Sequence, residues 1–285
     1  MKYDTLCLSG GSFSGICFLG ALSKLEKEKL IDLKKIKKFV GSSIGAIFSF
    51  VFCIGYTIDD LSNFIYNFDA SMFEQDIDLD LIINEFGINN GSRLLVAIQT
   101  FLYEKFKMKD ITFEELYKKT GKDIGIVVTN YSTMKEEYFS YLDTPKFSVL
   151  LSLRMSFSVP FLFTPVKYNK NIYVDGCFLN HFPINYCNPK TTLGLVLIKK
   201  QNSEPKNIFD YINGMKNVLL TSCSYKNEKY FDDILVMEGI SISLNQPDEM
   251  KKKLFIEGEY CAIEFCNNKP EYFIRKILLE IIKEF

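Results

Sequence analysis

Residues 41–45 read Gly-Ser-Ser-Ile-Gly, which places a serine between two glycines in the pattern Gly-x-Ser-x-Gly. An apolar run that reaches residue 40 predicts a strand before this segment, and the apolar residues 44–56 predict a helix after it. Together they indicate a sharp strand-to-helix turn that raises one serine above a sheet as a nucleophile. The glycines leave room for the turn, and the start of the helix favours negative charge near Ser43. An ordinary glycine-rich turn is the alternative that this pentapeptide alone leaves open.

A second glycine-rich segment, residues 9–15 (Ser-Gly-Gly-Ser-Phe-Ser-Gly), lies between a predicted strand over 3–8 and a predicted helix over 16–30. The backbone N–H groups of such a loop can bind an anion. The dinucleotide-binding pattern G-x-G-x-x-G is absent, and no acidic residue ends a clear strand about 20 residues further on. We therefore expect an oxyanion loop rather than a cofactor loop, with a plain turn as the alternative, and no bound cofactor.

An aspartate follows a predicted hairpin whose strands, residues 166–168 and 172–174, are joined by Asn-Lys-Asn. Asp175 ends the second strand, and glycine comes directly after it. An aspartate at a strand end is held on a loop above the sheet, where it can serve as a general base. A simple Asp-Gly turn is the alternative.

The composition excludes several classes of protein. The chain has 285 residues, 47% of them hydrophobic, which suits a single large domain over residues 1–285. A net charge of −1 argues against a nucleic-acid partner. The eight cysteines form no C-x-x-C pair and there is one histidine, so we expect reduced thiols and no metal site. No signal peptide is apparent, and the longest apolar stretch is shorter than the roughly 18–20 residues of a membrane helix.

These features predict a cytoplasmic location, compatible with peripheral attachment to membranes, and they leave the oligomeric state open. Residues 72–109 look mainly helical and either cover the site as a cap or pack against the core. Residues 149–156 predict a helix, and residues 192–198 predict a buried parallel strand. Further elements are predicted near the C-terminus: helices over 210–223, 247–260 and 270–285, and a strand over 234–237.

In chain order, the glycine-rich loop, the Gly-x-Ser-x-Gly turn and the Asp-Gly-Cys segment resemble the motifs of the patatin-like phospholipase family, especially its bacterial-type members. That family opens with a strand, a G-G-G-x-R/K-G loop and a helix, continues with G-x-S-x-G, and ends its site with D-G-G or D-G-A. Residues 156–160 (Ser-Phe-Ser-Val-Pro) and 175–183, which include Asn180 and Pro183, also resemble family segments. The resemblance covers about residues 3–200 and leaves a C-terminal extension over about 201–285.

The resemblance implies an α/β fold, a three-layer α/β/α sandwich with a mainly parallel central sheet and extra C-terminal helices. It also implies a serine lipid acyl hydrolase that cleaves phospholipids or related lipids at a membrane surface through an acyl-enzyme. One alternative is an acyltransferase that uses the same acyl-enzyme. Another is a catalytically silent protein that binds lipid or a partner.

By the same resemblance, Ser43 is the nucleophile and Asp175 the general base of a Ser-Asp dyad. The oxyanion hole is formed by the N–H groups around Gly10, Gly11 and Ser12. The glycines that support the motifs are Gly15, Gly41, Gly45 and Gly176. The chain departs from the family at three positions: Ser12 replaces the third glycine, Ser14 the loop cation, and Cys177 the last small residue of the aspartate motif. We expect the missing cation to lower turnover.

The single histidine raises a further alternative. Ser43, Asp175 and His181 follow one another in the chain order of an α/β-hydrolase triad. However, His181 lies only 6 positions after Asp175, whereas that fold needs its histidine on a later loop. We therefore expect the dyad, with His181 as a loop residue near the site.

Overall fold

The structure is a computed structural model that describes residues 2–68, 79–198, 204–205, 211, 214–215, 218, 233–239 and 247–268. The helix predicted over residues 270–285 lies outside the described residues, and the one over 210–223 lies largely outside them. Among the described residues, no helix has both the length and the apolar character needed to cross a bilayer.

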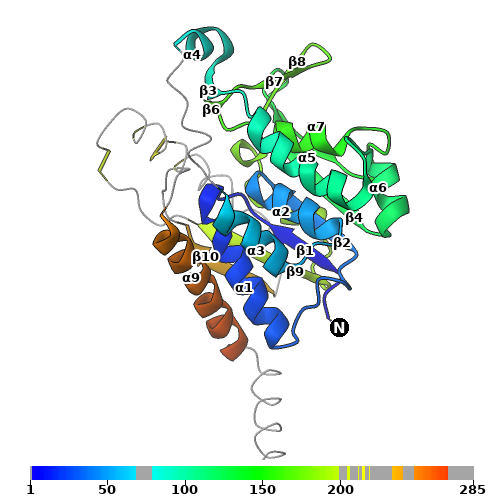
Figure 1. The fold of residues 1–285 in the computed structure, drawn as a ribbon, viewed down its shortest axis with the longest axis vertical. Helices are drawn as coiled ribbons and strands as arrows, with labels where there is room; N and C mark the ends of the chain where they lie inside the picture. Colours follow the sequence, from blue (N-terminus) through cyan, green and yellow to red (C-terminus); the bar gives the residue numbers. More distant parts are fainter. Residues whose placement is uncertain are drawn as a thin grey trace, which may run out of the picture.

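A central sheet runs through the molecule in the strand order β10-β9-β1-β2-β4-β8-β7, with β5 paired to β4 (Figure 1). Its successive parallel neighbours are β10 (Ile234–Glu238), β9 (Thr192–Ile198), β1 (Thr5–Leu8), β2 (Lys38–Ser42) and β4 (Asp123–Asn130). Antiparallel pairing brings in β5 (Lys135–Phe139), β7 (Val166–Tyr168) and β8 (Asn171–Asp175). The predicted fold class, an α/β fold with a mainly parallel central sheet and flanking helices, is confirmed.

Most of the helices pack around one large hydrophobic core on the central sheet, whereas the short helix over Leu79–Glu85 packs against the strand over Gly87–Asn89. The helices are α1 (Ile16–Lys27), α2 (Ile44–Cys53), α3 (Ile58–Asn67), α4 (Leu79–Glu85), α5 (Ser92–Phe106), α6 (Phe113–Thr120), α7 (Val149–Ser156) and α9 (Asp248–Asn267). Helix α2 is apolar on almost every side because it contacts β1, β2 and β4 as well as α5 and α7. Its burial explains the long apolar run that follows Ser43.

Neighbouring residues of the central strands face two different cores, as the alternation of side chains along a strand requires. Leu6 and Leu8 of β1 belong to the large core, whereas Cys7 lies in a smaller cluster on the opposite face. Phe182 and Ile184, from the segment after β8, cover that smaller cluster. The segment that follows Asp175 therefore holds the second face of the sheet in place.

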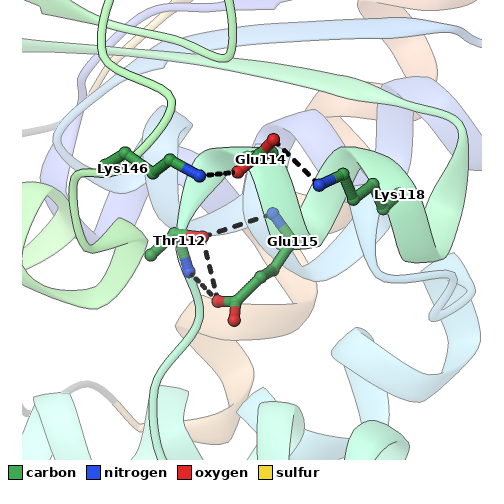
Figure 2. A network of polar contacts seen from close by, with 5 residues as sticks. All are labelled: Thr112, Glu114, Glu115, Lys118 and Lys146. Carbon is green, nitrogen blue, oxygen red and sulfur yellow. Dashed lines mark hydrogen bonds and ion pairs between the residues drawn. The ribbon is translucent and has the colours of Figure 1, made fainter.

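Helix α6 begins at a capping box formed by Thr112 and Glu115. The Thr112 hydroxyl accepts a hydrogen bond from the Glu115 amide at 3.3 Å, and the Glu115 carboxylate accepts one from the Thr112 amide at 2.9 Å. Glu114 forms ion pairs with Lys118, at 2.8 Å, and with Lys146 (Figure 2). These contacts fix the start of the helix and tie it to the loop that carries Lys146.

The described part of the region predicted as mainly helical over residues 72–109 is mainly helical, but it also contains a strand that the sequence does not predict. β3 (Gly87–Asn89) lies between α4 and α5 and pairs in parallel with β6 (Phe161–Phe163). The pairing depends on Gly87, since a Cβ at this position would collide with the backbone of Thr164. A strand of three residues is too short to show an alternating pattern, so periodicity does not reveal it.

Candidate functional site

Ser43 stands at the turn between β2 and α2, where the sequence places it. Its backbone has φ 54° and ψ −124°, a conformation that residues other than glycine rarely adopt. A Cβ on Gly41 would collide with the backbone of Gly45, and a Cβ on Gly45 would collide with the carbonyl groups at the end of β1. Both motif glycines are therefore needed for the strand and helix to approach this closely.

The Ser43 hydroxyl donates a hydrogen bond to Asp175, with 2.6 Å between Oγ and Oδ2. The other carboxylate oxygen, Oδ1, accepts the N–H of Cys177 at 2.8 Å. The Asp175 amide donates to the carbonyl of Ser158 at 2.9 Å. Ser43 is 6% exposed and Asp175 1%. The carboxylate is thus fixed in orientation and can accept the proton of the serine hydroxyl.

The register of the sheet explains why two residues 132 positions apart meet. β5 occupies one edge of β4, and β2 pairs along the other edge until Ser42 lies opposite Val127. β8 pairs with β4 along the same edge as β2, directly beyond the end of β2. The last residue of β8, Asp175, lies opposite Val128. Asp175 therefore stands directly beyond the carboxyl end of β2, where Ser43 begins the turn.

Ser156, the last residue of α7, connects this turn to the sheet. Its hydroxyl accepts the Ser43 N–H at 3.0 Å and donates to the carbonyl of Val127 at 2.7 Å. No role for Ser156 itself can be predicted from the sequence, because its two partners lie 113 and 29 positions away. The local signals are the family-like segment 156–160, which begins at Ser156, and a small polar residue at the end of a helix; neither predicts these hydrogen bonds.

Arg154, one helical turn before Ser158, is a buried cation beside the site and is 7% exposed. Its guanidinium donates to the hydroxyl of Ser158 and to the carbonyl groups of Asn90, at 2.8 Å, and Thr164, at 2.7 Å. It also lies 5.2 Å from the centre of the Phe157 ring. Burial lowers the pKa of the guanidinium to about 10. Its partners among the described residues are all neutral, so this charge is stabilised by hydrogen bonds that join α7 to the β3–β6 sheet.

The glycine-rich loop follows β1 and continues as a short 3₁₀ helix over Ser12–Gly15 that leads directly into α1. A Cβ on Gly10 would collide with Cys177 Sγ, and one on Gly11 with the Leu197 side chain. A Cβ on Gly176 would likewise collide with the backbone of β4. The predicted motif glycines therefore let the loop, the aspartate segment and the sheet pack closely.

The loop amides differ in their hydrogen bonds. The Gly10 amide donates to the carbonyl of His181 at 3.0 Å. The amides of Gly11 and Ser12 make no hydrogen bond to any residue that the structure describes. Ser12 has φ 52°, which turns its backbone sharply at the start of the 3₁₀ helix. Two of the three predicted oxyanion donors are therefore available to a ligand, while Gly10 is engaged in holding the loop.

His181 lies behind this loop and is buried. Its Nε2 is 2.9 Å from the carbonyl oxygen of Leu197 in β9, and its ring would touch a Cβ on Gly10. Ser14, which stands where the family has a cation, is also buried, at 1% exposed. Among the side chains that the structure describes, no group of His, Cys, Asp and Glu could hold a metal ion. The recorded partner of the Ser43 hydroxyl is thus Asp175, with His181 bound to the edge of β9.

Comparisons with known proteins agree with this architecture. A family model described as patatin-like phospholipase matches residues 6–187. The probable lipid hydrolase 463L of Invertebrate iridescent virus 6 is 32% identical over 268 residues, which are 90% of this chain and 87% of that protein. Triacylglycerol lipase 5 of Saccharomyces cerevisiae is 30% identical over 171 residues, 55% of this chain and 22% of that protein. The crystal structure of VipD from Legionella pneumophila shares the fold, with a TM-score of 0.69 and 15% identity over 93% of this chain and 67% of VipD. The chain therefore belongs to the patatin-like phospholipase family.

Proposed function

We propose that this protein is a lipid acyl hydrolase that cleaves carboxylic esters of phospholipids or related lipids through a Ser43–Asp175 dyad. The observation that carries the proposal is the 2.6 Å hydrogen bond from the Ser43 hydroxyl to Asp175 at a strained strand-to-helix turn. The names of two relatives, a probable lipid hydrolase and a triacylglycerol lipase, support an acyl ester as the substrate.

In the acylation step, Asp175 Oδ2 accepts the hydroxyl proton as Ser43 Oγ attacks the ester carbonyl carbon. The carbonyl oxygen becomes an oxyanion, for which the amides of Gly11 and Ser12 are the proposed donors. Each such donor is worth about 3–4 kcal/mol of transition-state stabilisation. The tetrahedral intermediate then collapses, the ester C–O bond breaks, and the leaving alcohol takes the proton from Asp175.

Deacylation uses the same residues in reverse order. Asp175 accepts a proton from a water molecule, and the oxygen of that water attacks the acyl carbon of the acyl-enzyme. The bond to Ser43 Oγ breaks, Ser43 recovers its proton from Asp175, and the fatty acid leaves. In this scheme, Gly10 positions the loop through its hydrogen bond to His181, and His181 carries no proton.

The first test is direct. Ser43→Ala and Asp175→Asn should each lower the hydrolysis of a chromogenic ester by a factor on the order of 10⁴ or more. The double variant should be no slower than either single variant, because the two residues act as one unit. Ser49→Ala is the matched control, because Ser49 is a buried serine of α2 whose hydroxyl has one hydrogen-bond partner among the described residues, the Val40 carbonyl at 3.4 Å.

A fluorophosphonate that labels active serines should modify the wild-type protein and the Ser49→Ala variant but not the Ser43→Ala variant. Substantial hydrolysis by the Ser43→Ala variant would overturn the assignment. A wild-type protein that is folded but neither labelled nor active would favour a lipid-binding protein without catalytic function.

A further inference from the structure

Three large apolar side chains are exposed around the β3–β6 sheet: Ile83 is 68% exposed, Phe86 57% and Phe161 56%. Gly87 of β3 lies opposite Phe161 of β6, which brings the backbone of Phe86 next to that of Phe161. Ile83 belongs to α4, which leads directly into this pair of strands at the edge of the molecule (Figure 1). We call Ile83, Phe86 and Phe161 the apolar tip. Large apolar side chains that stay exposed on paired strands and on the helix before them are candidates for an interaction surface.

Two members of the apolar tip also have an unusual backbone. Phe86 has φ 60° and Phe161 has φ 69°. Bulky residues avoid this left-handed region, which asparagine and glycine adopt with less strain. Both side chains are more than half exposed, so neither strain nor exposure is compensated by burial in the core. Strained positions of this kind are concentrated at functional sites.

The apolar tip is connected to the dyad by a short stretch of chain and by hydrogen bonds. Phe161 follows Ser158 by three positions, and the Ser158 carbonyl accepts the Asp175 amide. Arg154 binds the carbonyl groups of Asn90 and Thr164, which lie just beyond β3 and β6. The small sheet is therefore fixed to α7, the helix that also holds the Ser43 amide.

The named charges next to the apolar tip nearly balance, with one lysine left without an ion pair among the described residues. Glu85, which precedes Phe86, pairs with Lys167 of β7 at 3.3 Å. Lys170, in the turn between β7 and β8, is exposed and forms no ion pair with any described residue. Exposed aromatic residues combined with lysines suit the boundary between the headgroups and acyl chains of a membrane that contains anionic lipids.

We propose that the apolar tip inserts into the surface of a phospholipid bilayer and so presents the dyad to lipid esters held there. The lipid substrate in this inference rests on the proposed function, but binding through the tip does not require turnover. Continuity with the dyad, two exposed phenylalanine side chains and the charge of Lys170, which is unpaired among the described residues, favour a lipid surface over a protein partner.

The test measures binding alone, in the Ser43→Ala background, so that failure of the proposed hydrolysis leaves the result interpretable. Co-sedimentation is measured with vesicles of phosphatidylcholine and with vesicles of phosphatidylcholine mixed with phosphatidylglycerol. Phe86→Asn and Phe161→Asn should each lower the partition coefficient by about ten-fold, and the double variant by more. Their melting temperatures should not fall, because asparagine accepts a positive φ.

Leu142→Asn is the matched control. Leu142 is 79% exposed, but it follows Tyr141, whose amide binds Asp123 at the opposite end of β4 from the dyad. Its substitution should leave vesicle binding unchanged. Failure of the Ser43→Ala protein to bind either kind of vesicle would overturn the proposal. The proposal would also be overturned if the double variant bound vesicles as well as its parent. The same holds if the substitutions abolished self-association in sedimentation without changing vesicle binding, because the apolar tip would then contact a second copy of the chain.

Discussion

Ser43 has a strained backbone, and both its amide and its hydroxyl have hydrogen-bond partners. A residue held at such φ and ψ values carries a strain of about 1–3 kcal/mol, which the surrounding structure must offset. Here the amide is held by the Ser156 hydroxyl and the side chain by Asp175. The proposed nucleophile is therefore positioned through both its backbone and its side chain, before any substrate binds.

Ser156→Ala tests this view. The change leaves the Ser43 amide and the Val127 carbonyl without their recorded hydroxyl partner in a buried environment. We expect a loss of about 1–3 kcal/mol in the free energy of unfolding. We also expect kcat for ester hydrolysis to fall by about ten-fold or more, because the turn that carries Ser43 can shift. Urea unfolding and steady-state kinetics measure the two effects.

Ser152→Ala is the control for that prediction. Ser152 lies in the same helix and is fully buried, but the one partner of its hydroxyl among the described residues is the carbonyl of Val149, at 2.8 Å, within its own helix. Its removal should affect hydrolysis little. An equal fall in kcat for both variants would show that Ser156 has no specific role in positioning Ser43.

Ser43 and Asp175 can be predicted from the sequence because glycines lie within two positions of each. A side chain on these glycines would collide with neighbouring backbone. The sequence does not predict Ser156 or Arg154. Their partners come from β2, β4 and the β3–β6 region, so their roles exist only once those strands are assembled. The occupied amide of Gly10 could not be foreseen either, because its acceptor is the carbonyl of His181.

At the scale of elements, α7 links the proposed dyad to the β3–β6 sheet, and Arg154 makes hydrogen bonds across that link. We predict that Arg154→Lys lowers the free energy of unfolding by about 2–4 kcal/mol. A single ammonium group cannot reach the acceptors of a planar guanidinium, so buried carbonyl oxygens lose their donors. Hydrogen exchange of the β3 and β6 amides should quicken in the same variant.

Arg93→Lys, on the exposed surface of α5, is the control and should change stability by less than about 0.5 kcal/mol. If Arg154→Lys were equally harmless, the guanidinium would not be what fixes the small sheet to α7.

Helix α6 provides a prediction about pH (Figure 2). Hydrogen bonds from Lys118 and then Lys146 lower the pKa of Glu114 from 4.5 to about 2. A carboxylate with a lowered pKa in the folded state stabilises the protein above its unfolded pKa, and this contribution is lost as pH falls through the folded value. Glu114→Gln should therefore be less stable than the wild type at neutral pH. The difference should vanish as pH falls from about 4.5 to about 2.

Chemical unfolding at a series of pH values measures this difference. Because Glu114 is at the surface, the difference should be small and should shrink further in high salt. A difference that stayed constant from neutral pH to pH 2 would mean that charge on Glu114 is not its source.

Patterns in the sequence predict those elements whose signals are local. The capping box of α6, the buried helix α2 and helix α7 all follow from residues within the element. β3 and β6 do not, because each has three residues and is defined by its partner. Their pairing links a segment before α5 with one after α7, a contact that no local pattern contains.

At the scale of the whole molecule, the first and last described helices cross at very short range. α1 follows the glycine-rich loop, and α9 lies against it (Figure 1). A Cβ on Gly20 of α1 would collide with the Phe255 carbonyl, and one on Gly258 of α9 would collide with the Cys17 carbonyl. The predicted C-terminal extension thus contributes a helix that packs directly on the helix leading from the candidate oxyanion loop.

The close approach of α1 and α9 should reverse the usual stabilising effect of replacing a helix glycine with alanine. In a freely exposed helix, replacing glycine with alanine stabilises by about 1 kcal/mol. At Gly258 the added methyl group would meet backbone atoms of α1, which cannot rotate away, so Gly258→Ala should destabilise by about 1–3 kcal/mol. Adding Gly20→Ala should cost less than the sum of the two single changes, because either one already separates the helices. Ile256→Ala, at a site 62% exposed on α9, should change stability little. Thermal and urea unfolding measure the stability of each variant. A Gly258→Ala variant more stable than the wild type would show that α1 and α9 do not cross this closely in solution.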